Sequence, residues 1–147
     1  MLLFFMAIAQ MNWGKLKYLL EDEKMIEFSN SLNKVYSLAE DHPGFIWRIS
    51  DREAEFQLSE IGFDKFISST ISVWKNIEAL KDYTYNSLHG MYLKRSSEWF
   101  EKIEEPRLVI WNVEYNYKPT FKESFDRLEY LKINGPSDFA YGWKGHR

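Results

Sequence analysis

Apolar positions along the chain follow two different spacings, and the switches between them divide the sequence into strands and helices. Near-continuous apolar stretches predict four strands, at residues 2–12, 45–50, 66–74 and 107–115. Apolar residues spaced three and four apart predict helices over residues 22–40, from Asn76 onward, and over 120–134. Residues 51–65 carry mixed charge and one glycine, so we expect a hairpin connection there.

Local signals indicate where two of these helices begin. Asn76 is a favourable N-cap residue, and Thr120 with Glu123 forms a capping-box pattern at the start of the last helix. Residues 85–100 either continue the second helix or begin another one after a break near His89.

The predicted order is strand, helix, strand, strand, helix, strand, and then a C-terminal helix. This is the split βαβ, or ferredoxin-like, arrangement of an α+β domain, with an antiparallel four-stranded sheet. A length of 147 residues suits one such domain, and no repeat or linker divides the sequence. We therefore assign residues 1–147 to a single domain.

Side-chain alternation gives this sheet apolar positions on both faces. In the third strand Ile71 and Val73 point one way, and Ser72 points the other way between two rings at the strand ends. In the first strand Gln10 and Asn12 share a face. Both faces need a cover, and the predicted helices supply only one. We therefore expect a homodimer, a dimeric α/β barrel, whose two sheets enclose a partly polar, ring-lined ligand cavity.

Composition narrows the classes of function. The net charge of −3 gives no electrostatic footprint for nucleic acid, and the absence of cysteine excludes disulfides and thiolate nucleophiles. The opening run MLLFFMAIAQ is shorter than a membrane span and follows no cation, so we interpret it as a buried strand, with a cleaved secretion signal as the alternative. We expect a cytoplasmic protein with no membrane partner.

Five segments carry a family resemblance that spans nearly the whole chain. They are AQMN at 9–12, HPGFIWRI at 42–49, SVWKNIEALKDYTYNSLHGMYLKRSSEWF at 72–100, EEPRLVIWNV at 104–113 and PTFKESFDRLEYLKINGPS at 119–137. Together they resemble a largely uncharacterised bacterial family of the dimeric α/β-barrel superfamily. That family is similar to the antibiotic-biosynthesis monooxygenases, which oxygenate polyketide-like aromatics without metal or flavin, and it lies near haem-degrading and haem-binding relatives.

The resemblance implies a homodimer with a cavity for a small apolar or aromatic ligand. It also implies that no cofactor is needed, with haem as the alternative. In cofactor-free oxygenases of this superfamily an Asn, a Trp and an Arg or His near the cavity are typical working groups. Asn12, Trp74, His89 and Arg95 form a comparable set in this sequence.

His89, Arg95 and Asn12 are the candidate catalytic residues. His89 is the only histidine within a predicted element, and a neutral imidazole suits a general base or a haem ligand. The structural alternative is a hydrogen-bonded histidine at a helix junction. Arg95 offers a planar fork of donors for a carboxylate or phenolate, and its alternative is a surface ion pair with Glu98 or Glu101.

Aromatic and polar side chains complete the set as candidates for substrate binding. They are Trp74, Trp99, Tyr92, Trp47 and Arg48. Tyr92 and Trp99 share a helical stripe with Arg95, and alternation places Trp47 on the same face as Phe45. Core packing is the alternative interpretation for each tryptophan. For Asn12 and Arg48, the alternative is a hydrogen-bonded position at the end of the sheet.

The leading hypothesis is a monooxygenase-like reaction on an aromatic or polyketide-like substrate. His89 would remove a proton from an acidic C–H or a phenol, and the resulting carbanion would react directly with oxygen. Asn12, Arg95 or an indole N–H would stabilise the developing anion. The alternatives are a non-catalytic small-ligand-binding protein and a haem-binding protein with His89 as axial ligand. The first two hypotheses differ in whether His89 reaches the cavity.

Overall fold

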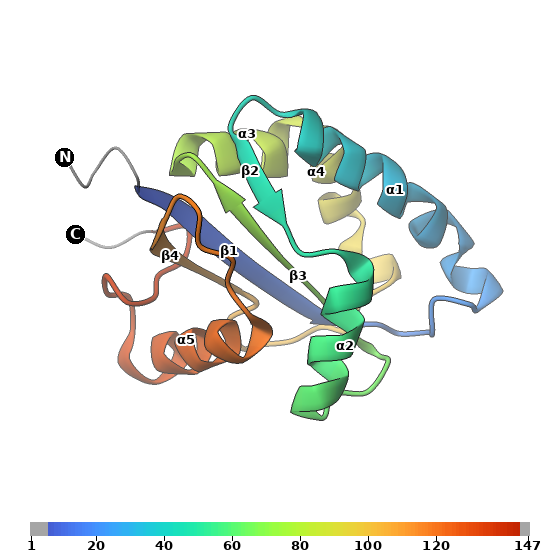
Figure 1. Cartoon of the computed structure of the whole chain (residues 1–147). Coiled ribbons are helices and arrows are strands. Elements are labelled where there is room, and N and C mark those ends of the chain that lie inside the picture. The colour runs from blue at the N-terminus through green and yellow to red at the C-terminus, as the bar shows by residue number, and fades with distance from the viewer. Residues whose placement is uncertain (1–5, 145–147) are drawn as a thin grey trace.

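The computed structural model describes residues 6–144, which contain a four-stranded antiparallel sheet. The strands are β1 (Met6–Lys15), β2 (Phe45–Arg48), β3 (Ile67–Trp74) and β4 (Leu108–Glu114). Their order across the sheet is β2-β3-β1-β4 (Figure 1), which confirms the ferredoxin-like topology. The first five residues of the opening apolar run lie outside the described residues, and β1 continues three residues beyond its predicted end at Asn12.

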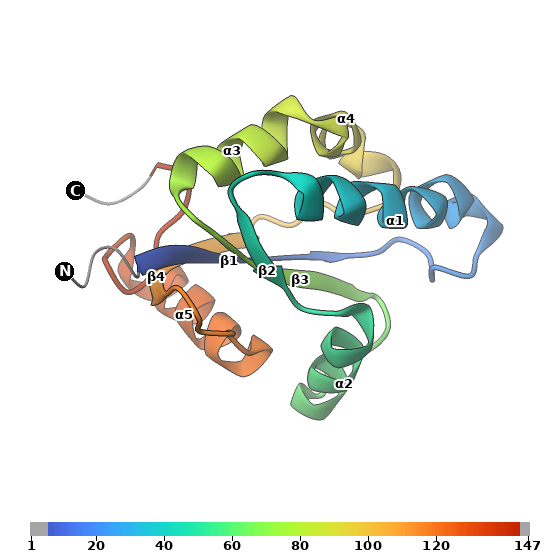
Figure 2. The ribbon, with the colours of Figure 1, turned by 45° about the horizontal axis from the view of Figure 1, so that its top comes forward.

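Helices cover both faces of this sheet (Figure 2). On one face lie α1 (Ile26–Asp41), α3 (Ile77–Asn86) and α4 (Leu88–Lys94), and on the other lie α2 (Asp51–Ile61) and α5 (Phe121–Asn134). Short 3-10 turns precede α1 at Glu23–Met25 and follow α4 at Ser96–Glu98. The side chains of Asn76 and Thr120 accept hydrogen bonds from the N–H groups of Ala79 and Glu123, which confirms both predicted helix starts.

The hairpin connection predicted for residues 51–65 is wrong, because most of that segment forms α2. The Ser50 side chain caps its first turn by accepting a hydrogen bond from the N–H of Glu53 at 3.2 Å. Gly62 ends the helix with a φ of 106°, a left-handed conformation that favours glycine. The chain therefore carries both α2 and α5, whereas the sequence predicted only the C-terminal helix α5.

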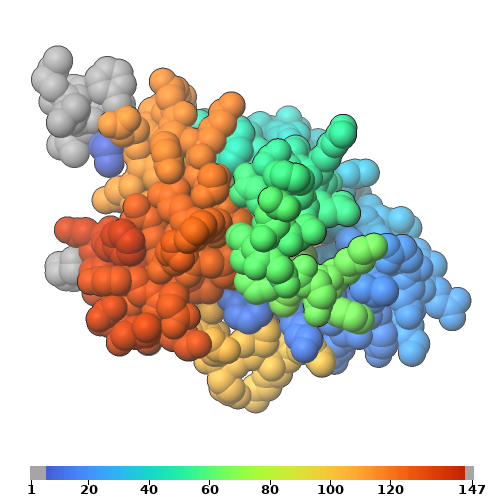
Figure 3. All heavy atoms as spheres, turned by 60° about the horizontal axis from the view of Figure 1, so that its bottom comes forward, coloured from blue at the N-terminus to red at the C-terminus, as the bar shows by residue number. Residues whose placement is uncertain are grey.

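The sheet face under α2 and α5 is buried within one chain. Eight of its apolar residues in β1, β3 and β4 are at most 6% exposed, namely Ala7, Ala9, Met11, Ile71, Val73, Val109, Trp111 and Val113. Phe121 of α5 packs into the same cluster, and Figure 3 shows α2 and α5 side by side on this surface. The premise that this face lacks a cover is therefore wrong. The homodimer itself stays a prediction.

An irregularity in β2 changes which of its side chains share a face. Phe45 pairs with Trp74 and Trp47 pairs with Val73, the next residue along β3, so Ile46 is an extra residue in the ladder. Phe45 packs beside Trp74, whereas Trp47 packs into the opposite cluster under α2 and α5. The predicted common face of Phe45 and Trp47 is wrong because the bulge interrupts the alternation.

Of the two alternatives for residues 85–100, the structure shows a second helix after a break, and the break falls at Ser87 rather than near His89. The Ser87 hydroxyl donates to the carbonyl oxygen of Tyr83 and accepts from the N–H of His89, so one side chain joins the end of α3 to the start of α4. Gly90 lies inside α4, where a Cβ atom would come within 2.4 Å of the Tyr85 carbonyl oxygen. Glycine at this position allows the two helices to meet closely.

Phe121 and Phe56 provide a matched test of the layer formed by α2 and α5. Phe121 is fully buried, whereas Phe56 on α2 is 61% exposed. Phe121→Ala should lower the free energy of unfolding by about 3–5 kcal/mol, because it leaves a cavity in the cluster. Phe56→Ala should lower it by about 0.5 kcal/mol or less. Urea denaturation measures both, and an equally small loss in the two variants would contradict the buried layer.

Candidate functional site

A cavity of about 400 Å³ lies between the sheet and the layer of α1, α3 and α4. Residues of β1 and β3 form its floor, and residues of the three helices form its roof. The volume lies in the range of about 300–1,000 Å³ that is typical of small-molecule sites. The sequence placed a cavity between two sheets, whereas this one lies within one chain, on the face opposite to α2 and α5.

The floor is a polar strip two strands wide. The register places Gln10 opposite Ser72, Asn12 opposite Thr70, and Gly14 opposite Ser68. All six residues line the cavity, because alternate residues of a strand share a face. At one end the Phe100 ring lies against Gly14, where a Cβ atom would come within 2.6 Å of that ring. Glycine therefore lets Phe100 close this end of the cavity.

A chain of hydrogen bonds fixes the side chains at the other end of the strip. Asn12 Nδ2 donates to Gln10 Oε1 at 2.9 Å, and Gln10 Nε2 donates to Ser72 Oγ at 2.8 Å. Trp74 Nε1 donates to the same Ser72 oxygen at 2.8 Å. Ser72 accepts twice and has no acceptor for its own proton among the described residues. Its O–H is therefore available as a donor to a bound molecule.

The roof of the cavity is aromatic. Its rings come from α1, α3 and α4, and they include Phe28, Tyr36, Tyr83 and Tyr92. Tyr83 stacks on Trp74 with ring centroids 5.1 Å apart and an angle of 27° between the planes. Its hydroxyl donates to the Val35 carbonyl oxygen at 3.0 Å, and burial raises the pKa of Tyr83, so the ring stays neutral. A flat molecule can thus contact rings on one side and polar groups on the other.

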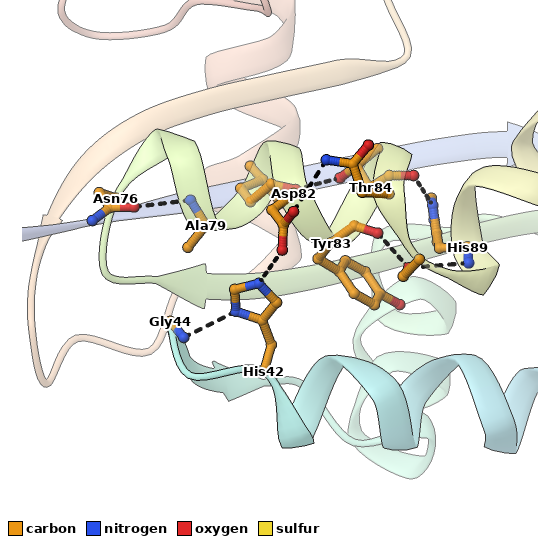
Figure 4. Close-up of polar contacts among 11 residues, drawn as sticks. His42, Gly44, Asn76, Ala79, Asp82, Tyr83, Thr84 and His89 are labelled. Carbon is orange, nitrogen blue, oxygen red and sulfur yellow. Dashed lines mark hydrogen bonds and ion pairs between the residues drawn. The ribbon is translucent and has the colours of Figure 1, made fainter.

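His89 borders this cavity at the start of α4. Its Nδ1 lies 3.0 Å from the Thr84 carbonyl oxygen (Figure 4), so in the neutral ring Nδ1 carries the proton and Nε2 carries the lone pair. Burial lowers the pKa of His89, and the bond to Thr84 opposes this shift only in part. No described residue bonds to Nε2. The imidazole is therefore a neutral base beside the cavity.

His42 shows the contrasting, fully bonded arrangement. Its Nε2 lies 2.9 Å from an Asp82 carboxylate oxygen, and its Nδ1 accepts from the Gly44 N–H at 3.0 Å (Figure 4). Nε2 thus joins the end of α1 to α3, and Nδ1 holds the turn that follows α1. The contrast supports the choice of His89 as the candidate base.

Three of the predicted site residues lie outside the cavity lining. Arg95 is held on the outer surface by Glu27, at 2.6 and 2.8 Å, and by Glu98, at 2.7 and 3.0 Å. These hydrogen bonds lower the pKa of both carboxyl groups. Trp99 packs behind the roof, and Trp47 packs on the opposite face of the sheet. The alternatives of a surface ion pair and of core packing describe these three residues.

The remaining candidates do line the cavity. They are His89, Asn12, Trp74, Tyr92 and Arg48. Arg48 comes from the edge strand β2 and lies opposite Ser72 in the register. Its guanidinium carbon lies 4.0 Å from the centre of the Tyr36 ring. Five of the eight predicted residues thus meet around one space, although their catalytic and binding roles stay predictions.

Sequence reasoning missed Ser72, Tyr36 and Tyr83 as cavity residues. Ser72 is one of several serines in β3, and only the hydrogen bonds from Gln10 and Trp74 distinguish it. Tyr83 could have been predicted, because an amphipathic helix from Asn76 has to bury one side of residues 80–84.

Residues 6–144 contain neither a cluster of metal-ligating side chains nor a membrane-spanning helix. No group of three or more His, Cys, Asp or Glu side chains in this range could hold a metal ion. No helix in the same range is long and apolar enough to cross a membrane.

Solved structures similar to this chain share its fold. A conserved protein from Methanosarcina mazei Go1 is 19% identical with a TM-score of 0.51, over 78% of this chain and 97% of that one. A protein of unknown function from Nitrosomonas europaea is 9% identical with a TM-score of 0.50, over 78% and 94%. SnoaB, a cofactor-independent oxygenase from Streptomyces nogalater, is 11% identical with a TM-score of 0.45, over 80% and 98%. The first two confirm the fold.

Comparison with protein families gives a match along nearly the whole chain. No protein of curated function matches this sequence. One family model, described as a domain of unknown function (DUF3291), matches residues 7–147. This confirms the resemblance to an uncharacterised family. The chain therefore belongs to the DUF3291 family.

Proposed function

We propose that the cavity binds a flat aromatic or polyketide-like molecule and promotes its oxygenation by molecular oxygen without a cofactor. The observation that carries this proposal is the state of His89. Its ring borders the cavity, burial lowers its pKa, and only Nδ1 has a hydrogen-bond partner among residues 6–144. Nε2 is thus an unprotonated base within reach of a bound molecule.

Proton removal is the first step of the proposed reaction. His89 Nε2 takes a proton from an acidic C–H or a phenol of the substrate, and negative charge develops on a substrate oxygen. The Ser72 O–H donates to that oxygen, because Gln10 and Trp74 already occupy the Ser72 lone pairs. Asn12 acts as a positioning residue, since it orients the Gln10 amide.

Oxygen then reacts with the carbanion. The carbon forms a bond to O₂, and the resulting peroxide anion takes back the proton held by His89. Loss of water from the hydroperoxide leaves a carbonyl, so a CH₂ group and O₂ become C=O and H₂O. The substrate supplies all the electrons, and the aromatic roof limits contact between water and the carbanion.

Binding without chemistry is the second candidate, and one contact favours it. The bond from His89 Nδ1 to the Thr84 carbonyl oxygen joins α4 to α3, so His89 also has a structural task. A haem-binding protein is the third candidate, in which His89 Nε2 would hold the iron. Activity, titration and absorbance separate these three possibilities.

Anthrone, a flat molecule with an activated CH₂ group, tests the reaction. We expect the protein to accelerate anthrone oxidation above the spontaneous rate, with O₂ consumed and anthraquinone formed in equal amounts. His89→Gln should lower the protein-dependent rate by at least about 100-fold, because the amide is not a base. An oxygen electrode and the absorbance of anthraquinone measure the two quantities.

Arg95→Gln is the control for the anthrone experiment, because Arg95 lies outside the cavity lining and its ion pairs are exposed. This variant should keep the rate of the unmodified protein. An unchanged rate in His89→Gln would exclude His89 as the base. Absence of any protein-dependent rate would favour plain binding.

The titration of His89 provides a test that needs no substrate. Burial lowers the pKa of His89, so its NMR signals should shift with an inflection below the usual value of about 6.5. The neutral base then persists at pH 6.5 and is lost only as the pH falls through the lowered pKa. His89→Gln identifies the signals. An inflection at or above pH 6.5 would mean that the His89 ring is exposed to water and is not buried beside the cavity.

Absorbance and native mass of the purified protein test the cofactor and the assembly. We propose a cytoplasmic homodimer that needs no cofactor, as the resemblance to dimeric α/β barrels implies. Native mass spectrometry should then give twice the chain mass of 17.7 kDa, with no absorbance beyond that of the aromatic side chains. A Soret band that disappears in His89→Gln would support haem binding instead. A monomer would contradict the homodimer.

A further inference from the structure

The guanidinium group of Arg48 has N–H donors that its partners within the described chain leave unused. Its Nε donates to Glu40 at 3.1 Å, and its Nη1 contacts the Ile49 carbonyl oxygen at 3.0 Å and Asp51 at 3.5 Å. Within residues 6–144, nothing accepts a hydrogen bond from Nη2. The Arg48 side chain is only 18% exposed and lines the cavity, whereas Glu40 and Asp51 are 50% and 70% exposed. The carboxylates thus hold the guanidinium from the solvent side.

Tyr36 adds a second unmatched donor beside Arg48. Its ring lies under the guanidinium at 4.0 Å and lines the same cavity. Burial, reinforced by the Asp51 carboxylate, raises the pKa of Tyr36, so its hydroxyl keeps its proton. No acceptor for this hydroxyl occurs in the described part of the chain. Tyr36 lines the cavity and its hydroxyl is not among the fully buried polar atoms, so this O–H can donate to an acceptor on a bound molecule.

The register brings these donors close to Ser72. Arg48 and Ser72 are direct neighbours across β2 and β3, and adjacent strands lie about 4.8 Å apart. The Ser72 O–H is the third donor without an acceptor at this end of the cavity. Three donor groups and one positive charge therefore border the same cavity, and no carboxylate of the described chain lines it.

We propose that Arg48 and Tyr36 form a subsite for the ionised carboxylate of a flat aromatic acid, whose ring lies between the polar strip and the aromatic roof. A carboxylate accepts several hydrogen bonds and matches the planar donors of arginine. Bound there, it places the neighbouring ring beside Ser72. The subsite rests on the proposed function, because it specifies which aromatic molecules that cavity would accept.

Two isosteric ligands, 2-naphthoate and 2-naphthamide, test the subsite by calorimetric titration. They share ring and shape and differ in charge, so the charge-assisted bonds should make 2-naphthoate bind at least about tenfold more tightly. Arg48→Gln should bring the two affinities within about twofold of each other. Arg107→Gln is the matched control, because Arg107 also lines the cavity but lies away from Ser72, next to Leu108, the residue that pairs with Asn12. It should keep the preference.

Tyr36→Phe is a second variant that leaves the ion pairs of Arg48 in place. It removes one hydroxyl, so the preference for 2-naphthoate should fall by a part of its value, whether or not Arg48→Gln folds. Equal affinity of the unmodified protein for both ligands would overturn the proposed subsite. A preference that Arg107→Gln removes and Arg48→Gln keeps would also overturn it, and so would a failure of both ligands to bind. Anthrone carries no carboxylate, so its oxidation tests the proposed function separately.

Discussion

The antiparallel pairing of β1 with β3 is the constraint on which the rest of the structure depends. Its register places Gln10 opposite Ser72, and alternation then sends the polar side chains of both strands to one face. A slip of β3 by one residue would put Ser72 under α2 and α5 and turn Val73 toward the cavity. The hydrogen bonds among Gln10, Ser72 and Trp74 therefore help to specify the register and also shape the cavity floor.

The two helical layers divide stability and function between them. Under α2 and α5 the sheet face is covered, and Trp111 and Phe121 are fully buried there. Under α1, α3 and α4 the layer spans an open space, which forfeits packing contacts. The burial of apolar side chains under α2 and α5 offsets this loss of packing contacts. One sheet can thus carry a cavity within a single chain, and no second subunit is needed to cover its apolar face.

Features that depend on neighbouring residues were predictable from the sequence. The strand order, the polar positions at Gln10 and Asn12, and the caps at Asn76 and Thr120 all follow from local spacing and residue type. The helix α2 carried the same kind of signal, since Ser50 and Glu53 have capping-box spacing. The mixed charge of residues 51–65 favoured a hairpin connection over a helix. Without α2, one face of the predicted sheet had no cover within the chain, and the sequence therefore predicted a cover from a partner chain.

Features of the site that depend on distant partners were not predictable. Arg95 is held on the surface by Glu27, 68 residues away, and a bulge moved Trp47 to the other face. Ser72 is set apart by a donor 62 residues away. Such contacts decide which polar atoms are already bonded and which stay available. The available atoms, rather than the residue types, define the chemistry of the cavity, and they combine one lone pair at His89 with donors at Ser72, Tyr36 and Arg48. Because that combination accepts a proton at one point and donates to an anion at another, it suits a ligand that is both acidic and flat.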